Sequence, residues 1–184
     1  MRKSETLASA ERTLADHSPD TRTGFAALVR LHQSMVFSIA LHFLADRPAA
    51  EELAQDVFLQ LHANLPNLKS EDHVKFWLRK VTAHRCIDHK RRRKLPQVSI
   101  EEIAEPSAPT RSVDPLLQRK LCQVIASLPE KPRLVMILRY QEDMEPEEIA
   151  EALAMPVATV RSHLQRSLAL LREKVSRSIG EVTI

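Results

Sequence analysis

The residues best suited to bind a nucleic acid form a basic run in the first half of the chain. Eight Lys or Arg residues and a single carboxylate, Asp88, occur between Arg79 and Lys94. Cations at the end of a helix favour the helix dipole, but five in succession exceed what that effect requires. We predict that this run contacts nucleic-acid phosphates. The five consecutive cations are Lys90, Arg91, Arg92, Arg93 and Lys94.

A second candidate lies near the C-terminus, where the pattern predicts a helix-turn-helix. A short helix, a break at Met155-Pro156 and a longer helix follow in the order expected of a DNA-reading motif. An ordinary helical hairpin with a solvated charged face is the alternative. Opposite its apolar stripe, the second helix carries side chains able to bind base edges or phosphates. These are Thr159, Arg161, Ser162, Gln165 and Arg166.

Two aromatic residues, Phe76 and Trp77, precede the basic run. An aromatic ring at this place could stack on an unpaired base. The alternative for Trp77 is packing in the core, because it stands beside Leu78 and Val81.

The composition favours helices throughout. Only two of the 184 residues are glycine, so residues that suit tight β-turns are scarce. Hydrophobic residues (43%) suffice for a core, and we expect neither a lipid-spanning stretch nor a signal peptide. Cys86 and Cys122 are too few and too far apart for a disulfide framework or a zinc site. We expect a reduced, cytoplasmic, all-α protein that needs no metal and no cofactor.

Apolar periodicity predicts a first small helical domain over residues 21–94, after an N-terminal arm of residues 1–20. Two amphipathic helices joined near Pro48 precede a third from about Asp72 to about Arg93, with Ser70 or Asp72 as its cap.

A second helical domain is predicted over residues 115–177. Prolines and glutamates punctuate residues 95–114, which indicates a flexible linker between the domains. The second domain should begin with a helix whose stripe runs from Leu117 to Leu128, followed by a short helix around Leu134 to Leu138. The two helices of the helix-turn-helix, Pro146 to Leu153 and Val157 to about Val175, should complete it.

Three segments resemble the extracytoplasmic-function sigma factors of bacterial RNA polymerase in sequence, order and spacing. They are AAEELAQDVFLQLH, KFWLRKVTAHRCIDHKRRRK and SLPEKPRLVMILRYQEDMEPEEIAEALAMPVATVRSHLQRS. The resemblance covers roughly residues 22–176. It implies a protein that directs core RNA polymerase to specific promoters and assists their opening. The implied partners are core polymerase and promoter DNA. The resemblance leaves open whether an anti-sigma factor is a third partner, and it implies no insertion into a membrane.

The resemblance also implies which residues carry these roles. The helix from Glu51 to Leu61 would dock on the clamp helices of polymerase, although core burial is the alternative for its Leu53 and Phe58. The third helix would recognise and melt the minus-ten element, and the helix-turn-helix would bind the minus-thirty-five element. The implied polymerase-binding residues are Glu51, Glu52, Leu53, Gln55, Asp56 and Phe58; the implied minus-ten residues are Trp77, Lys80, His84, Arg85 and Asp88, followed by the basic run.

The chain departs from the family pattern at several places. His84 stands where many members have Asn, and the usual TVRSRLHRAR reads TVRSHLQRSL, so His163 and Leu168 replace arginines. His163 stays among the residues expected to face DNA. Ala154 stands where Gly is common, and a left-handed backbone there would strain Ala by about 1 kcal/mol.

Three further alternatives concern function. The acidic linker would either mimic RNA in the polymerase channel or act as a passive tether. A stand-alone helix-turn-helix regulator would need only the C-terminal half of the chain. An enzyme is not expected, because the chain lacks an HExxH motif, a phosphate loop and a nucleophile elbow.

Overall fold

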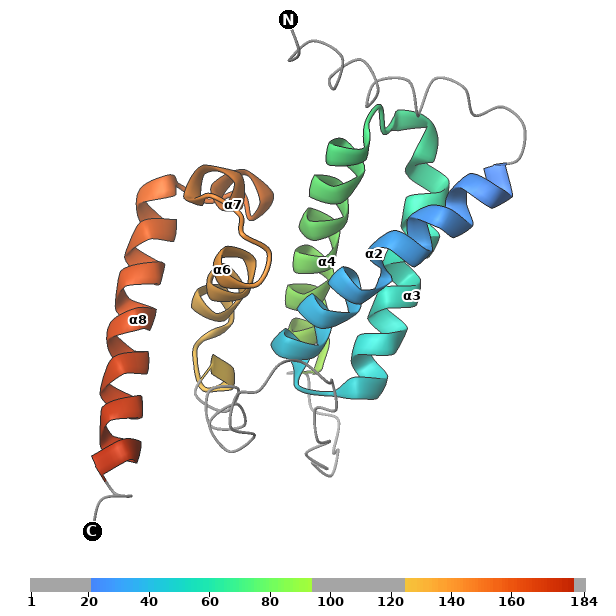
Figure 1. The fold of residues 1–184 in the computed structure, drawn as a ribbon. Coiled ribbons are helices and arrows are strands. Elements are labelled where there is room, and N and C mark those ends of the chain that lie inside the picture. Colours follow the sequence, from blue (N-terminus) through green and yellow to red (C-terminus); the bar gives the residue numbers. More distant parts are fainter. Residues whose placement is uncertain (1–20, 94–124, 181–184) are drawn as a thin grey trace, which may run out of the picture.

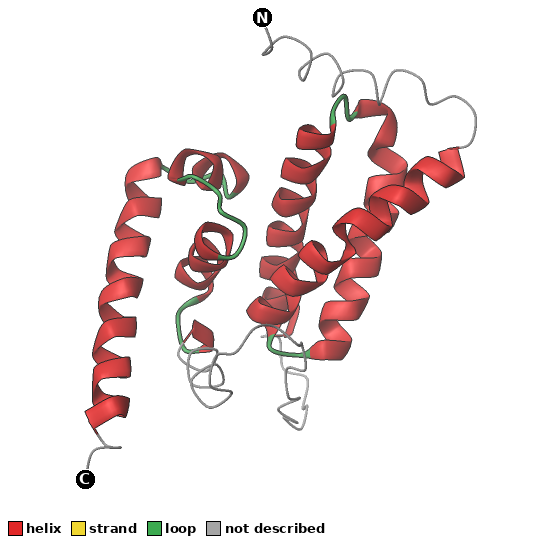
Figure 2. Cartoon of the chain, viewed as in Figure 1, coloured by secondary structure: helices red, strands yellow, loops and turns green. Residues whose placement is uncertain are grey.

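The computed structural model describes residues 21–93 and 125–180, with side chains over 24–92 and 125–174. The described residues contain helices and no strand, which confirms the all-α prediction (Figures 1 and 2). The helices are α2 (Thr21–Leu44), α3 (Arg47–Asn64), the 3-10 turn η1 (Leu65–Asn67), α4 (Glu71–Arg93), α6 (Glu130–Tyr140), α7 (Pro146–Ala152) and α8 (Val157–Gly180).

The first half is a bundle of α2, α3 and α4 around a shared apolar core (Figure 1). Ile39 and Phe43 from α2, Leu61 from α3 and Leu78 from α4 are fully buried in it. Burying each such side chain contributes about 1.5–3 kcal/mol. By length and composition the segment Gly24–Leu44 could also cross a membrane. Its apolar residues instead supply the centre of this core.

The helix boundaries in this bundle follow local capping chemistry. α2 ends at Leu44, and Ala45 after it has a positive φ of 55°. Asp46 caps α3 by accepting from the Ala49 main-chain N–H at 3.0 Å. Pro48 therefore lies within the first turn of α3, where its fixed φ fits. Ser70 caps α4, because its Oγ accepts from the His73 main-chain N–H at 3.1 Å.

The second half places α6 between α8 and the first bundle (Figure 1). α6 is longer than the sequence predicted, because it begins at Glu130 and accommodates Pro132 in its first turn. Every residue from Arg133 to Leu138 is buried. Of the predicted stripe before α6, Leu128 is buried, and Leu117, Leu121 and Val124 lie outside the described residues. The linker 95–114 also lies outside them.

The turn between α7 and α8 needs a left-handed residue, as the sequence suggested. Ala154 has a φ of 48°. Its N–H donates to the Glu151 oxygen at 3.3 Å, and the Met155 N–H donates to the Ala150 oxygen at 3.0 Å. This pair of hydrogen bonds is a Schellman motif, which usually has Gly at the Ala154 position.

Candidate nucleic-acid interface

α4 presents one outer stripe of residues that suit DNA. Trp77, Lys80, His84 and Arg91 follow one another at three-, four- and seven-residue spacing, so they share a face. Leu78, Thr82 and Cys86 are buried on the inner face. The stripe becomes more exposed toward its C-terminal end, because Trp77, Lys80 and His84 are half-buried and Arg91 is exposed.

Trp77 packs against the core and keeps part of its surface exposed. Trp77 and Phe76 are half-buried and pack against the apolar core, which agrees with the core alternative. Trp77 nevertheless keeps part of its surface open on the same stripe as His84. A ring held in this way is positioned by packing and can still offer an edge or face to a base.

Arg85 is directed to the side of that stripe. Its Nη1 lies 3.9 Å from Oδ2 of Asp56 on α3, and the two side chains are 29% and 53% exposed. The pair links the helix implied to bind DNA to the helix implied to bind polymerase. Of the basic run, Arg91 and Arg92 are exposed and Lys90 is half-buried. The Arg93 side chain and Lys94 lie outside the described residues.

α8 separates an apolar inner face from a polar outer one. Val160 and Ser167 are buried, and Leu164 and Leu171 lie on the same side as they do. Gln165 is exposed and Ser162 is half-exposed, and both lie away from that inner face. Arg166 is also exposed, at the edge of the outer face toward α6, where it lines a cavity. Thr159 is half-buried in the first turn. The described residues thus keep the predicted outer face, whose chemistry suits phosphates and base edges.

His163 lies on the inner flank of α8, and the structure does not bring it to the outer face. It is half-buried and lines a cavity of about 750 Å³ with Lys131, Arg133 and Arg166. Burial lowers the pKa of His163, and the charges of Arg166 and Lys131 lower it further. His163 stands where the resembling family has an arginine that was expected to face DNA. The neighbours of His163 in the structure instead favour a neutral ring packed beside α6.

The outer face of α3 carries a polar strip with one apolar residue. Glu52, Gln55 and Asp56 are exposed, and Leu59, one turn further, is 70% exposed. Glu51 is also exposed and pairs with Arg47 at 3.0 Å. Leu53 and Phe58 are core residues, 5% and 9% exposed, so their predicted contact with a partner is replaced by packing. Leu59 was not among the residues predicted to bind polymerase, although its i+3 and i+7 spacing from Asp56 and Glu52 places it on the same strip.

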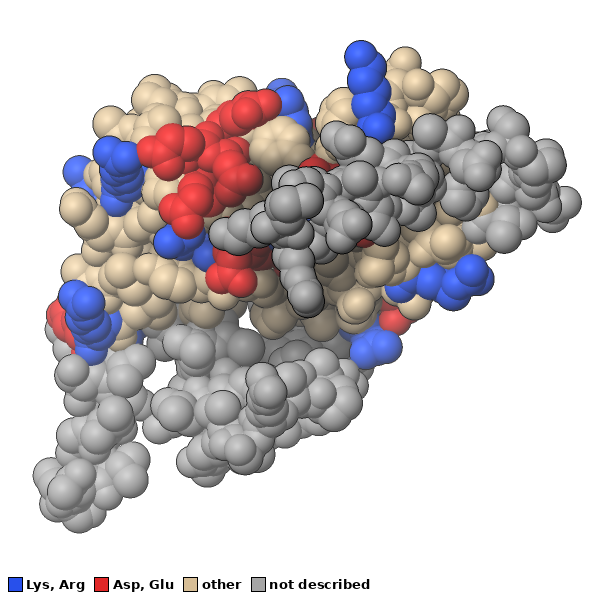
Figure 3. All heavy atoms as spheres, turned by 45° about the horizontal axis from the view of Figure 1, so that its top comes forward, with Lys and Arg blue, Asp and Glu red and all other residues tan. Residues whose placement is uncertain are grey.

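Acidic side chains gather over α7, beside the basic α8 (Figure 3). The exposed members are Asp143, Glu145, Glu147, Glu148 and Glu151. Glu147 reaches α8, where its Oε1 accepts from Arg161 Nη2 at 2.7 Å. Arg161, 63% exposed at its side chain, therefore lies at the α7 edge of the outer face.

The described residues hold no group of three or more His, Cys, Asp or Glu side chains that could bind a metal ion. Burial raises the pKa of the Cys86 thiol to about 12. A thiol with that pKa stays protonated and is a poor nucleophile.

Two family models match separate parts of the chain. The family model "Sigma-70 region 2" matches residues 28–95, and "Sigma-70, region 4" matches residues 118–171. An RNA polymerase sigma-E factor of Streptomyces coelicolor is 30% identical over 151 residues, covering 82% of this chain and 85% of the relative. The ECF RNA polymerase sigma factor SigW of Bacillus subtilis is 25% identical over 166 residues, covering 82% of this chain and 88% of SigW.

Two solved structures share the fold. The sigma factor RpoE in complex with the anti-sigma factor NepR, from Bartonella quintana, superposes with a TM-score of 0.71 at 20% identity. The match covers 83% of this chain and 97% of RpoE. CnrH in complex with the cytosolic domain of CnrY gives a TM-score of 0.64 at 18% identity, covering 92% of this chain and 94% of that chain.

Proposed function

This chain belongs to the extracytoplasmic-function sigma factors, which direct RNA polymerase to promoters, and we propose how its surfaces divide that work. Residues 21–94 bind core polymerase and the minus-ten element, and residues 115–177 bind the minus-thirty-five element. Residues 1–20 form an arm and residues 95–114 a linker. One observation carries the proposal: α4 and α8 each pair a buried apolar face with an exposed face that bears cations.

The outer face of α3 is the proposed polymerase-binding surface. Glu52, Gln55 and Asp56 supply polar groups, and the exposed Leu59 supplies an apolar contact. An apolar residue surrounded by polar groups matches the apolar centre and polar rim of a protein–protein interface. Leu53 and Phe58 support this surface from below and do not belong to it.

A pull-down with core polymerase tests the α3 surface. The full-length variant Glu52→Arg/Gln55→Ala/Leu59→Ala should keep its helical circular dichroism and lose most of its core binding. Leu31→Ala is the matched control, because Leu31 is 57% exposed on α2 and outside the strip. Normal retention of core by the triple variant would refute this surface.

The outer stripe of α4 is the proposed minus-ten surface. Trp77 and His84 contact bases there, and Lys80, Arg91 and Arg92 neutralise phosphates, so this helix assists promoter opening. Arg85 orients α4 on α3 through Asp56. The half-buried Trp77 supports a stacking role, because its packed side fixes the ring.

Salt dependence tests the cationic part of that surface. Each phosphate contact removed should reduce the log–log slope of DNA binding by about one. Holoenzyme with Arg91→Ala/Arg92→Ala should therefore lose about two units of slope in open-complex formation and keep normal core binding. An unchanged slope would show that these arginines do not contact phosphates and only stabilise the C-terminal end of α4 through the helix dipole.

The outer face of α8 is the proposed reader of the minus-thirty-five element. Arg161 and Gln165 reach base edges, Ser162 and Arg166 bind phosphates, and Thr159 lies at the end that enters the major groove. His163 is left out of this set, since its burial beside Lys131 supports a packing role.

The proposal extends to partners and place of action. The sigma factor RpoE, which shares this fold, was solved in complex with the anti-sigma factor NepR, which supports an anti-sigma factor as a partner of this chain. We place the protein in the cytoplasm with polymerase and DNA, where it acts without catalysing a reaction of its own.

A further inference from the structure

An ion pair joins the two helices of the helix-turn-helix on their outer side. Arg161 Nη2, in α8, donates to Glu147 Oε1, in α7, at 2.7 Å. The side chains are 63% and 58% exposed, so solvent screens the pair and it adds little to stability. The main effect of this ion pair is therefore to fix the position of the Arg161 guanidinium.

The backbone on both sides of this pair is well fixed. Ile149 of α7 and Val160 of α8 are fully buried, which sets the spacing of the two helices. Glu147 lies in the first turn of α7, where the Glu148 carboxylate accepts from the Glu145 main-chain N–H at 2.7 Å. The Glu147 carboxylate is thus carried by a rigid turn and approaches Arg161 from one side.

A carboxylate at one side of a guanidinium leaves donors on the other side free for a ligand. Arg has five N–H donors in a planar fork, and the bond to Glu147 uses Nη2. A guanidinium held in place also loses less conformational entropy when it binds a base edge. A DNA phosphate, by contrast, would be repelled by the neighbouring carboxylate.

We propose that Glu147 is a specificity-determining residue of the recognition helix, which holds Arg161 for a base edge and away from phosphates. The favoured ligand is guanine, whose O6 and N7 accept two parallel hydrogen bonds from arginine. The inference rests on the proposed role of α8 in reading the minus-thirty-five element. Glu147 acts through Arg161 and is a positioning residue.

The test uses holoenzyme made from the full-length chain and core polymerase. Binding is measured by fluorescence anisotropy on a promoter fragment selected with the unmodified holoenzyme, and on single-base-pair variants of its upstream element. The substitutions are Glu147→Gln, Arg161→Ala, the two combined, and Glu151→Gln. Glu151→Gln is the matched control, because it removes the same charge from an exposed position of the same helix.

Arg161→Ala should reduce discrimination at one base pair by about tenfold or more, as expected for loss of a bidentate contact. Glu147→Gln should reduce discrimination at that same base pair by about three- to tenfold, mainly by strengthening binding to the wrong sequences. Glu151→Gln should change the affinity for all sequences alike. The double variant should discriminate no worse than Arg161→Ala, because both residues act through one contact.

Two results would overturn the inference. One is that Glu147→Gln behaves like Glu151→Gln and changes all affinities by the same factor. The other is that Arg161→Ala leaves discrimination unchanged at every base pair, which removes the group through which Glu147 acts. Failure of the proposed function looks different, since the unmodified holoenzyme would then show no preference within the upstream element.

Discussion

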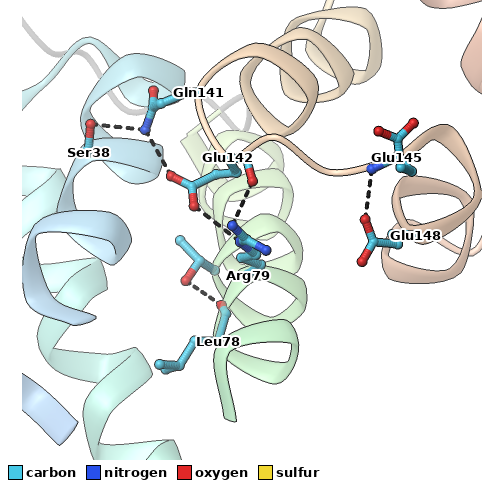
Figure 4. A network of polar contacts seen from close by, with 8 residues as sticks. Ser38, Leu78, Arg79, Gln141, Glu142, Glu145 and Glu148 are labelled. Carbon is cyan, nitrogen blue, oxygen red and sulfur yellow. Dashed lines mark hydrogen bonds and ion pairs between the residues drawn. The ribbon is translucent and has the colours of Figure 1, made fainter. Parts of the chain in front are cut away.

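Arg79 of α4 and Glu142, which follows α6, form an ion pair that joins the two halves of the molecule (Figure 4). Arg79 Nε donates to Glu142 Oε2 at 3.1 Å, and Arg79 Nη2 donates to the main-chain oxygen of Glu142 at 2.6 Å. The two side chains are 13% and 8% exposed. Beside them, Gln141 donates to Ser38 Oγ at 2.9 Å, and Arg133 donates to the Phe43 oxygen at 2.8 Å. The halves therefore dock through polar groups that water reaches poorly.

Glu142→Gln should separate the two halves without unfolding either one. Removing one partner of a buried pair leaves an uncompensated charge and costs about 3–5 kcal/mol. Distances between spin labels on cysteines introduced at Lys69 and Arg172, both exposed, would report the separation. The distribution should broaden toward longer distances, whereas the exposed Glu151→Gln control should leave it narrow. Equal distributions for both variants would show that this pair does not hold the halves together.

Promoter binding should also open the molecule. Lys90 at the end of α4 and Arg166 on α8 line one cavity, so the two surfaces proposed to bind DNA lie close together. The minus-ten and minus-thirty-five elements are about 25 base pairs apart, or about 85 Å along B-DNA. Residues 94–124 can span about 100 Å when extended, which is enough. The same label pair should move apart by tens of ångströms in the promoter complex, and an unchanged distance would contradict the assignment of both surfaces.

Ala154→Gly should stabilise the protein. Ala154 has a φ of 48° at the end of α7, a conformation that costs Ala about 1 kcal/mol and Gly almost nothing. The gain should be somewhat below that figure, because Gly also loses more entropy on folding. Ala169→Gly is the matched control: it lies on the exposed face of α8 and should lose about 0.5–1 kcal/mol. Urea unfolding of both variants measures the change in the free energy of unfolding, which should rise for Ala154→Gly and fall for Ala169→Gly. A decrease for both variants would exclude strain at Ala154.

The stability of the first bundle should fall in mild acid because of His32. Burial lowers the pKa of His32, as do Lys75 and Arg79, whereas Glu71 raises it; its Nε2 has no hydrogen-bond partner among the described residues. A lowered pKa means that the unfolded chain binds the proton more readily. The free energy of unfolding should therefore decrease as the pH falls below about 6.5 and level off below the folded pKa.

His32→Gln provides the comparison for that pH dependence. Gln does not titrate, so this variant should lose less stability than the unmodified protein between about pH 7 and pH 5.5. The free energy of unfolding in urea at several pH values measures the difference. Parallel pH profiles for the two proteins would assign the acid sensitivity to other groups.

The sequence predicted what depends on periodicity and local chemistry. The apolar stripes of α2, α3, α4 and α8 follow from neighbouring residues, and of the two predicted caps of α4, Ser70 and Asp72, the structure has Ser70. The left-handed turn at Ala154 was suggested by the resemblance to a family in which Gly is common there. The predicted junction near Pro48 is confirmed: α2 ends at Leu44, α3 begins at Arg47, and Pro48 lies in the first turn of α3, where its fixed φ fits. In α8 the stripe passes through Ser167, a polar residue that is 1% exposed and that hydrophobicity alone does not reveal.

Contacts between distant segments were not predictable in this way. Arg79 counted among the cations of the basic run, yet it is withdrawn from solvent by Glu142, 63 positions away. His163 was expected on the DNA-facing side, but it is half-buried and lines a cavity together with Lys131 and Arg133 of α6. Arg161 was expected to be free for DNA, and Glu147 holds it. These relationships depend on how the helices dock, which the spacing of residues within one helix does not determine.

Run-off transcription tests the central claim most directly, namely that this chain selects promoters through α4 and α8. Core polymerase from the same organism would be supplied with the full-length chain and with promoter fragments selected by that holoenzyme. We expect transcripts that require the chain and that fall sharply when either the minus-ten or the minus-thirty-five element is scrambled. Transcription no greater than that of core polymerase alone, or transcription indifferent to both elements, would contradict the account.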